Sequence, residues 1–166
     1  MRLFITGATG LLGRRLVADR LARGDEVGVL SRDAARARKR LPGVVDVIEG
    51  GPGHPGPWQQ AIDGRDAVIH LAGAGIADRR WTPAYKRLLV SSRIDSSHQL
   101  VEAFRQSDVR PRVLGAASAG GCYGDGGEEP LDERAPLEAG DFLAELCRAG
   151  EEASAPARSL GVRVVD

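Results

Sequence analysis

The chain has 166 residues, which fits one domain with a real hydrophobic core. Its 23 basic and 23 acidic residues balance, so no overall field draws it to nucleic acid or to a membrane surface. No apolar segment is long enough to cross a bilayer and no signal peptide is evident, so neither insertion nor secretion is expected. The two cysteines, Cys122 and Cys147, suggest no disulfide framework and fit a reducing cytoplasm.

A glycine-rich segment follows the first predicted strand. That strand covers residues 2–5, and residues 6–13 then read TGATGLLG before a predicted helix. Gly7 lets the chain turn sharply, Gly10 leaves the backbone open to a pyrophosphate at the helix N-terminus, and Gly13 lets the helix lie close to the sheet. A glycine-rich turn without a ligand is the alternative, but the position directly after a first strand favours nucleotide binding.

The end of the second predicted strand indicates the type of cofactor. In a dinucleotide fold this point faces the adenosine ribose, where an acid binds the 2′-hydroxyl and an arginine accommodates a 2′-phosphate. Ser31 and Arg32 stand here, and Asp33 is expected to cap the next helix instead. The sequence therefore favours NADP over NAD. The basic run over residues 36–40 is predicted to be a solvated helix face rather than a nucleic-acid patch, with Arg36 near the 2′-phosphate.

The fourth predicted strand ends in small residues. Ala72 and Gly73 follow it, so a cofactor can lie across the carboxyl edge of the sheet at the switch point. His70 is a candidate proton donor, but its place inside an apolar strand favours a hydrogen-bonded core histidine.

Strands and helices alternate to the end of the chain. Thr82 followed by Pro83 is a strong helix start, and a glycine-rich loop begins at Ser118, where substrates bind in such folds. The predicted strands cover residues 2–5, 26–30, 44–48, 66–71, 110–117 and 162–165. Helices are predicted over 11–23, 83–106 and 142–159, the last disturbed at Pro156, and residues 58–62 form at best a short helix. Because the pattern is β-α-β throughout, we expect one α/β domain over residues 1–166, a Rossmann-like doubly wound parallel sheet of order 3-2-1-4-5-6.

Taken together, the motifs resemble the short-chain dehydrogenase/reductase superfamily. Residues 6–13 match its cofactor signature, and residues 70–73 (HLAG) match its fourth-strand signature. More narrowly, the chain resembles the atypical or extended branch of nucleoside-diphosphate-sugar epimerase-like proteins, the NAD-dependent epimerase/dehydratases. The resemblance implies an NADP phosphate contact at Ser31 and Arg32, which agrees with the reading above. The expected cofactor-binding residues are Gly7, Thr9, Gly10, Leu11, Leu12, Gly13, Ser31, Arg32, Leu71, Ala72 and Gly73.

The superfamily's catalytic residues are only partly present. Hydride transfer in the superfamily uses a Tyr-x-x-x-Lys pair after the fifth strand, in which the Lys lowers the pKa of the Tyr. In this register the chain has Cys147 and Glu151, and a thiol with a carboxylate cannot reproduce that pair. Ser118 fits the catalytic Ser/Thr position, and Tyr123 is the nearby phenol, with packing of the substrate loop as its alternative role. No metal site is expected.

The resemblance also implies parts that the chain lacks. Relatives continue past the sixth strand into a further strand and a small C-terminal substrate domain, so we expect a truncated product whose sixth strand is an exposed edge. Three functions stay open: an NADP-dependent oxidoreductase or epimerase acting on a small molecule such as a nucleotide sugar, an NADP(H)-binding module without turnover, and a nonfunctional fragment. No nucleic-acid or membrane partner is expected, and the resemblance allows a homodimer through residues 83–106 and 142–159.

Overall fold

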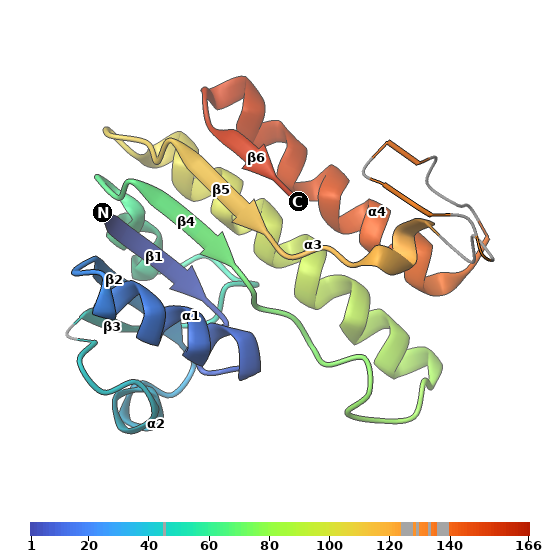
Figure 1. Cartoon of the computed structure of the whole chain (residues 1–166), viewed down its shortest axis with the longest axis horizontal. Coiled ribbons are helices and arrows are strands. Elements are labelled where there is room, and N and C mark those ends of the chain that lie inside the picture. The colour runs from blue at the N-terminus through green and yellow to red at the C-terminus, as the bar shows by residue number, and fades with distance from the viewer. Residues whose placement is uncertain (45, 124–127, 129, 133, 136–139) are drawn as a thin grey trace.

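The computed structural model describes residues 1–44, 46–123, 128, 130–132, 134–135 and 140–166. Its strands are β1 (Arg2–Thr6), β2 (Glu26–Ser31), β3 (Asp46–Glu49), β4 (Ala67–His70), β5 (Val113–Ala116) and β6 (Arg163–Val165). Its helices are α1 (Leu11–Ala22), α2 (Ala34–Arg40), α3 (Pro83–Gln106) and α4 (Phe142–Ser154), with short 3₁₀ helices η1 (Pro57–Ile62), η2 (Gly120–Tyr123) and η3 (Ala155–Leu160). The strands form one parallel sheet of order β3-β2-β1-β4-β5-β6, which confirms the predicted fold (Figure 1).

The side chains of β1 show how the sheet is covered on both faces. Leu3 and Ile5 join the buried cluster that includes residues of α1 and α2. Phe4 points the other way, into the cluster formed with α3, η1 and η3, and it stacks on Trp58 with ring centroids 6.4 Å apart. This alternation follows the two-residue period of a strand, and burial of both faces is typical of parallel sheets.

Two strands, β3 and β5, differ from the predicted ranges by more than one residue at an end. β3 runs from Asp46 to Glu49, later than the predicted range of 44–48, of which Val45 lies outside the described residues. β5 begins at Val113 rather than at residue 110. Pro111 precedes it, and a proline cannot donate to the ladder of a central strand.

The helix after the fifth strand is disturbed at Pro156, as predicted. α4 ends at Ser154, and the chain continues as η3 with Pro156 in its first turn. Because proline lacks an N–H and its ring clashes with the preceding turn, the α-helical pattern cannot continue through this point. Among the described residues, no helix is both long and apolar enough to cross a membrane.

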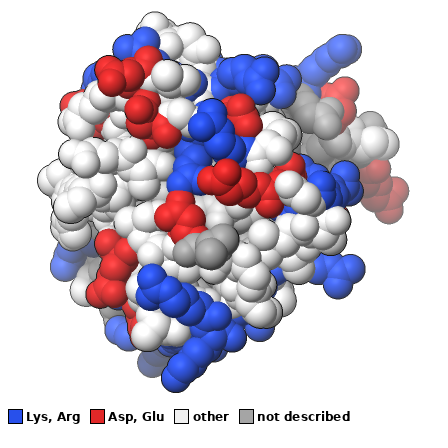
Figure 2. Space-filling model, turned by 90° about the vertical axis from the view of Figure 1, so that its left-hand side faces the viewer, with Lys and Arg blue, Asp and Glu red and all other residues white. Residues whose placement is uncertain are grey.

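Charges of both signs are mixed over the surface around α2. Figure 2 shows blue and red side chains interleaved on this face of the molecule. In α2 itself Ala34 and Ala37 are buried, whereas the four basic side chains are exposed. α2 is therefore a solvated helix, as predicted. Its exposed basic residues are Arg36, Arg38, Lys39 and Arg40.

Candidate functional site

The turn between β1 and α1 has a conformation that depends on glycine. Gly7 has a φ of +71°, and a Cβ there would lie 2.5 Å from the carbonyl carbon of Leu71. A Cβ on Gly13 would lie 2.5 Å from the carbonyl oxygen of Gly7 and 2.6 Å from Cα of Ala8. Gly7 thus makes the predicted sharp turn. Gly13 brings α1 against the turn itself, rather than directly against the sheet as predicted.

The N-terminus of α1 presents backbone amides to an open surface. Gly10 is the N-cap residue, and within the described chain no side chain caps it and no acidic residue stands in the first turn. Leu11 and Leu12 are 80% and 70% exposed, and a Cβ on Gly10 would meet only the carbonyl oxygen of Gly7, at 3.2 Å. Free N–H groups and the helix dipole at such an N-terminus favour an anion, which is the geometry that the predicted diphosphate contact needs.

The end of β2 carries an exposed arginine. Ser31 Oγ donates to the carbonyl oxygen of Asp33 at 3.0 Å and accepts the Asp33 N–H at 3.2 Å. The Asp33 carboxylate accepts the Arg36 N–H at 2.8 Å and so caps α2, as predicted. Arg32 forms no ion pair with any described residue. Its guanidinium is therefore available to a ligand phosphate.

The predicted residues after β4 lie beside the turn after β1. The Leu71 N–H donates to the carbonyl oxygen of Thr6 at 3.1 Å, and Gly7 contacts the Leu71 backbone. Leu71 and Ala72 are half-buried, and Gly73 is exposed. Because β1 pairs in parallel with both β2 and β4, the predicted cofactor residues meet at one edge of the sheet, where its topology reverses.

Side chains from α3 hold the loop that continues from β4. The Ala74 N–H donates to Ser92 Oγ at 3.0 Å, and Arg93 Nη1 donates to the carbonyl oxygen of Ala74 at 3.1 Å. Tyr85 Oη donates to the carbonyl oxygen of Gly75 at 2.5 Å. These bonds fix the loop against α3.

His70 is a buried structural residue. Its Nδ1 lies 2.6 Å from Thr6 Oγ1 and its Nε2 lies 2.9 Å from Ser96 Oγ. Ser96 Oγ lies within donating distance of the carbonyl oxygens of Ser92 and Arg93, so we assign it as the acceptor from Nε2–H and Thr6 as the donor to Nδ1. Burial, with a smaller contribution from Arg93, lowers the pKa of His70 to about 4. The histidine is neutral near pH 7, which confirms the core interpretation over the proton donor.

The carboxyl end of β5 faces α4 through Ser118. Its Oγ donates to Glu151 Oε1 at 2.5 Å, so the residue in the lysine register does reach the predicted catalytic serine. Burial raises the pKa of the Cys147 thiol, and Cys122 and Glu151 act in the same direction. The thiol is therefore protonated at neutral pH. Cys147 and Glu151 are predicted from the sequence to stand in the register of the superfamily's phenol and ammonium, and that register remains a prediction.

Tyr123 ends η2, which packs against α4, and its side chain is half-buried. Gly124 and Asp125, which follow it, lie outside the described residues. The catalytic roles of Ser118 and Tyr123 remain predictions.

Arg93 was not among the residues predicted to have a functional role, although the pattern of α3 contains a signal for it. Leu89, Ser96 and Leu100 are fully buried and stand four residues before, three after and seven after Arg93. A charged residue within this buried stripe of a helix needs polar partners, and the backbone of the β4 loop supplies some of them.

Comparisons with known proteins agree with this geometry. The profile of the NAD dependent epimerase/dehydratase family matches residues 3–142. A chloroplastic homologue of epimerase family protein SDR39U1 from Arabidopsis thaliana is 36% identical over 158 residues, which cover 91% of this chain and 43% of that protein.

Two solved structures share the fold and more than a quarter of the sequence. Human epimerase family protein SDR39U1 (isoform 2), with NADPH, is 26% identical with a TM-score of 0.77, covering 93% of this chain and 48% of its own. The Bordetella bronchiseptica enzyme WbmG, in complex with NAD and UDP, is 26% identical with a TM-score of 0.73, covering 93% and 49%. The chain thus spans about half the length of the relatives it matches. Because the family profile covers most of its residues, the chain belongs to the NAD-dependent epimerase/dehydratase family.

Proposed function

We propose that this chain is the NADP(H)-binding domain of an epimerase-family oxidoreductase whose substrate is a small carbonyl compound or a nucleotide sugar. The observation that carries the proposal is the exposed guanidinium of Arg32, without an ion pair in the described chain, at the same sheet edge as the uncapped N-terminus of α1. One relative was solved with NADPH and another with NAD, so the residues at the end of β2 are the basis for choosing NADP.

Each part of the edge has a binding task in this proposal. The first amides of α1 hold the diphosphate, and Arg32 holds the 2′-phosphate with Arg36 nearby. The small residues Ala72 and Gly73 leave room for the nicotinamide half, which when bound supplies or accepts a hydride.

Substitution of Arg32 tests the phosphate assignment. Arg32→Ala should cost about 2 kcal/mol of NADPH binding free energy, roughly thirtyfold in affinity, because a charge-assisted hydrogen bond is lost. NADH lacks the 2′-phosphate, so its affinity should change little. Fluorescence titration of both nucleotides measures this, with Arg40→Ala on the solvated face of α2 as the matched control. An equal loss for NADPH and NADH would refute the assignment.

For catalysis we propose that Ser118 contacts the substrate while its hydroxyl group is held by the hydrogen bond to Glu151. Tyr123 is the second candidate for a catalytic residue. The register of α4 favours another function, an NADP(H)-binding module without turnover, because Cys147 and Glu151 cannot act as an activated phenol. A screen of NADPH oxidation with carbonyl compounds and UDP-sugars separates the two. Turnover that disappears in Ser118→Ala supports the enzyme, whereas saturable NADPH binding without turnover supports the module.

We also propose a homodimer that forms through the outer faces of α3 and α4. Leu88 on α3 is 45% exposed, and a depression of about 360 Å³ nearby is lined by Val90, Ile94 and Phe142 among others. Light scattering after gel filtration should give twice the chain mass for the wild type and the chain mass for Leu88→Glu. A wild-type monomer would contradict this assembly.

The two free cysteines are consistent with a cytoplasmic location.

A further inference from the structure

Arg93 holds the β4 loop with only part of its hydrogen-bonding capacity. Its Nη1 donates to the carbonyl oxygens of Ala74 and Leu89, each at 3.1 Å. An arginine has five N–H donors, of which Nη1 carries two. The donors on Nη2 and Nε have no hydrogen-bond partner among the described residues. Anchoring the loop therefore leaves one edge of the guanidinium unused.

The guanidinium also lacks a counter-charge in the described chain. No carboxylate lies within ion-pair distance of Arg93 there, and Glu151, on the adjacent helix α4, is hydrogen-bonded to Ser118. The side chain is half-buried, and burial lowers the pKa of Arg93 from its usual value, although the group stays protonated at any ordinary pH. A partly desolvated cation without a partner is costly, and an anionic ligand offsets that cost.

The place of Arg93 separates it from the proposed phosphate contacts of the cofactor. Its guanidinium lies against Gly73, where a Cβ would be 3.3 Å from Cζ, and α3, which carries Arg93, packs against α4. The diphosphate and 2′-phosphate are assigned instead to α1 and Arg32, on the other side of β4 in the sheet order. An anion at Arg93 therefore belongs to the molecule that occupies the edge between β4 and β5.

We propose that Arg93 is the anion receptor of the substrate side, binding a carboxylate or phosphoryl group of the small-molecule substrate through Nη2 and Nε. The planar fork of a guanidinium matches two oxygens of such a group, and its bonds to Ala74 and Leu89 hold the fork in place before binding. This inference rests on the proposed function, and it narrows the substrate to a molecule with an anionic group near its reacting carbon.

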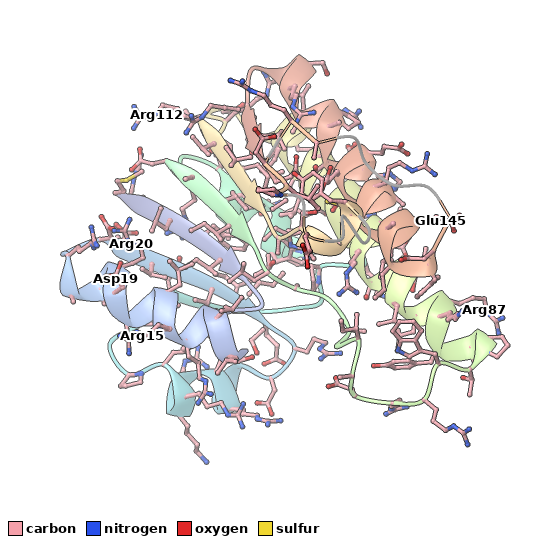
Figure 3. The ribbon with its side chains drawn as sticks, turned by 45° about the vertical axis from the view of Figure 1, so that its right-hand side comes forward. Arg15, Asp19, Arg20, Arg87, Arg112 and Glu145 are labelled. Carbon is pink, nitrogen blue, oxygen red and sulfur yellow. The ribbon has the colours of Figure 1, made fainter. Side chains whose placement is uncertain are left out.

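Chemical labelling of arginine in the whole chain tests the proposal without a substitution. The chain is treated with phenylglyoxal, with and without NADPH, in the presence of oxalate or inorganic phosphate, and labelled arginines are located by peptide mass spectrometry. Oxalate and phosphate should each slow labelling of Arg93 at least about fivefold, as expected for a charge-assisted site. Arg112, which lies at the opposite edge of the sheet and pairs with Asp66, is the internal control and should not change (Figure 3).

Substitutions then show which arginine binds the anion. Arg93→Gln should abolish saturable oxalate binding while NADPH affinity changes by less than about twofold. Arg87→Gln, on the same helix but near its N-terminal end in Figure 3, should leave oxalate binding unchanged. Labelling that neither anion slows, or an Arg93→Gln variant that loses NADPH as strongly as oxalate, would overturn the proposal. Because labelling is also measured without NADPH, anion binding at Arg93 can be judged even if the chain does not bind NADPH.

Discussion

The two halves of the carboxyl edge differ in how much of the family's machinery they keep. On the side of β1, α1 and β2, the turn fits its neighbours so closely that a single Cβ would collide with backbone, and the charged Arg32 is free for a ligand. On the side of β4, α3, β5 and α4, the fold is equally complete, but the catalytic register holds Cys147 and Glu151. Cofactor binding and hydride transfer therefore need separate tests in this chain.

The two halves are joined by one buried hydrogen-bonded chain. His70 at the end of β4 is hydrogen-bonded on one side to Thr6 at the end of β1 and on the other side to Ser96 on α3. Every member of this network has a hydrogen-bond partner, so the loss of one member leaves a buried polar group of another unsatisfied.

The largest effect is expected at the turn after β1. Gly7→Ala should destabilise the chain by at least about 3 kcal/mol and remove NADPH binding, because the new Cβ meets the Leu71 backbone at a positive φ. Gly24→Ala is the matched control, since Gly24 has a φ of +78° with open space around it. Strain alone should cost that variant about 1 kcal/mol. Urea unfolding of both variants measures the difference, and equal losses would show that the close contact with β4 is unimportant.

The next effect is the pH dependence that His70 contributes. Its folded pKa of about 4 lies below the ordinary value of 6.5, so the unfolded chain binds a proton between these values and the folded chain does not. The contribution is complete above about pH 6.5 and is lost as the pH falls towards 4, by about 3 kcal/mol in total.

His70→Asn isolates this contribution from the carboxylates that titrate at lower pH. Free energies of unfolding from urea titrations at pH 7 and pH 4.5 should fall more in the wild type than in the variant. If the free energy of unfolding fell equally in both proteins, the fold would not keep His70 neutral.

The smallest effect concerns the altered register of α4. Glu151 helps to raise the pKa of the Cys147 thiol, and Arg93 opposes it. Glu151→Gln should therefore lower that pKa and speed alkylation of Cys147 by iodoacetamide near pH 8, whereas Arg93→Gln should slow it. Mass spectrometry of the labelled peptide over a pH series gives both directions. Rates that move the same way in both variants would contradict this electrostatic picture.

The contrast between the halves also explains what the sequence could predict. The glycine spacing, the alternation of elements and the cap at Asp33 are local signals, and the structure confirms the sheet order and the capped helix. The start of β5 was predicted too early, although Pro111 stands within the predicted range and cannot donate to the ladder of a central strand. The contact of Ser118 with Glu151 joins distant segments, depends on how α4 packs across the sheet and has no signal in local spacing. The contact of Arg93 with Ala74 had only an indirect signal, the charged residue within the buried stripe of α3.

The central claim is that the edge formed by β1, α1 and β2 binds NADP through its diphosphate and its 2′-phosphate. A crystal of this chain grown with NADP⁺ tests it most directly. The account predicts diphosphate density at the amides that follow Gly10, and a 2′-phosphate within hydrogen-bonding distance of the Arg32 guanidinium. An empty edge in a fully soaked crystal, or a dinucleotide whose 2′-phosphate lies away from Arg32, would contradict it.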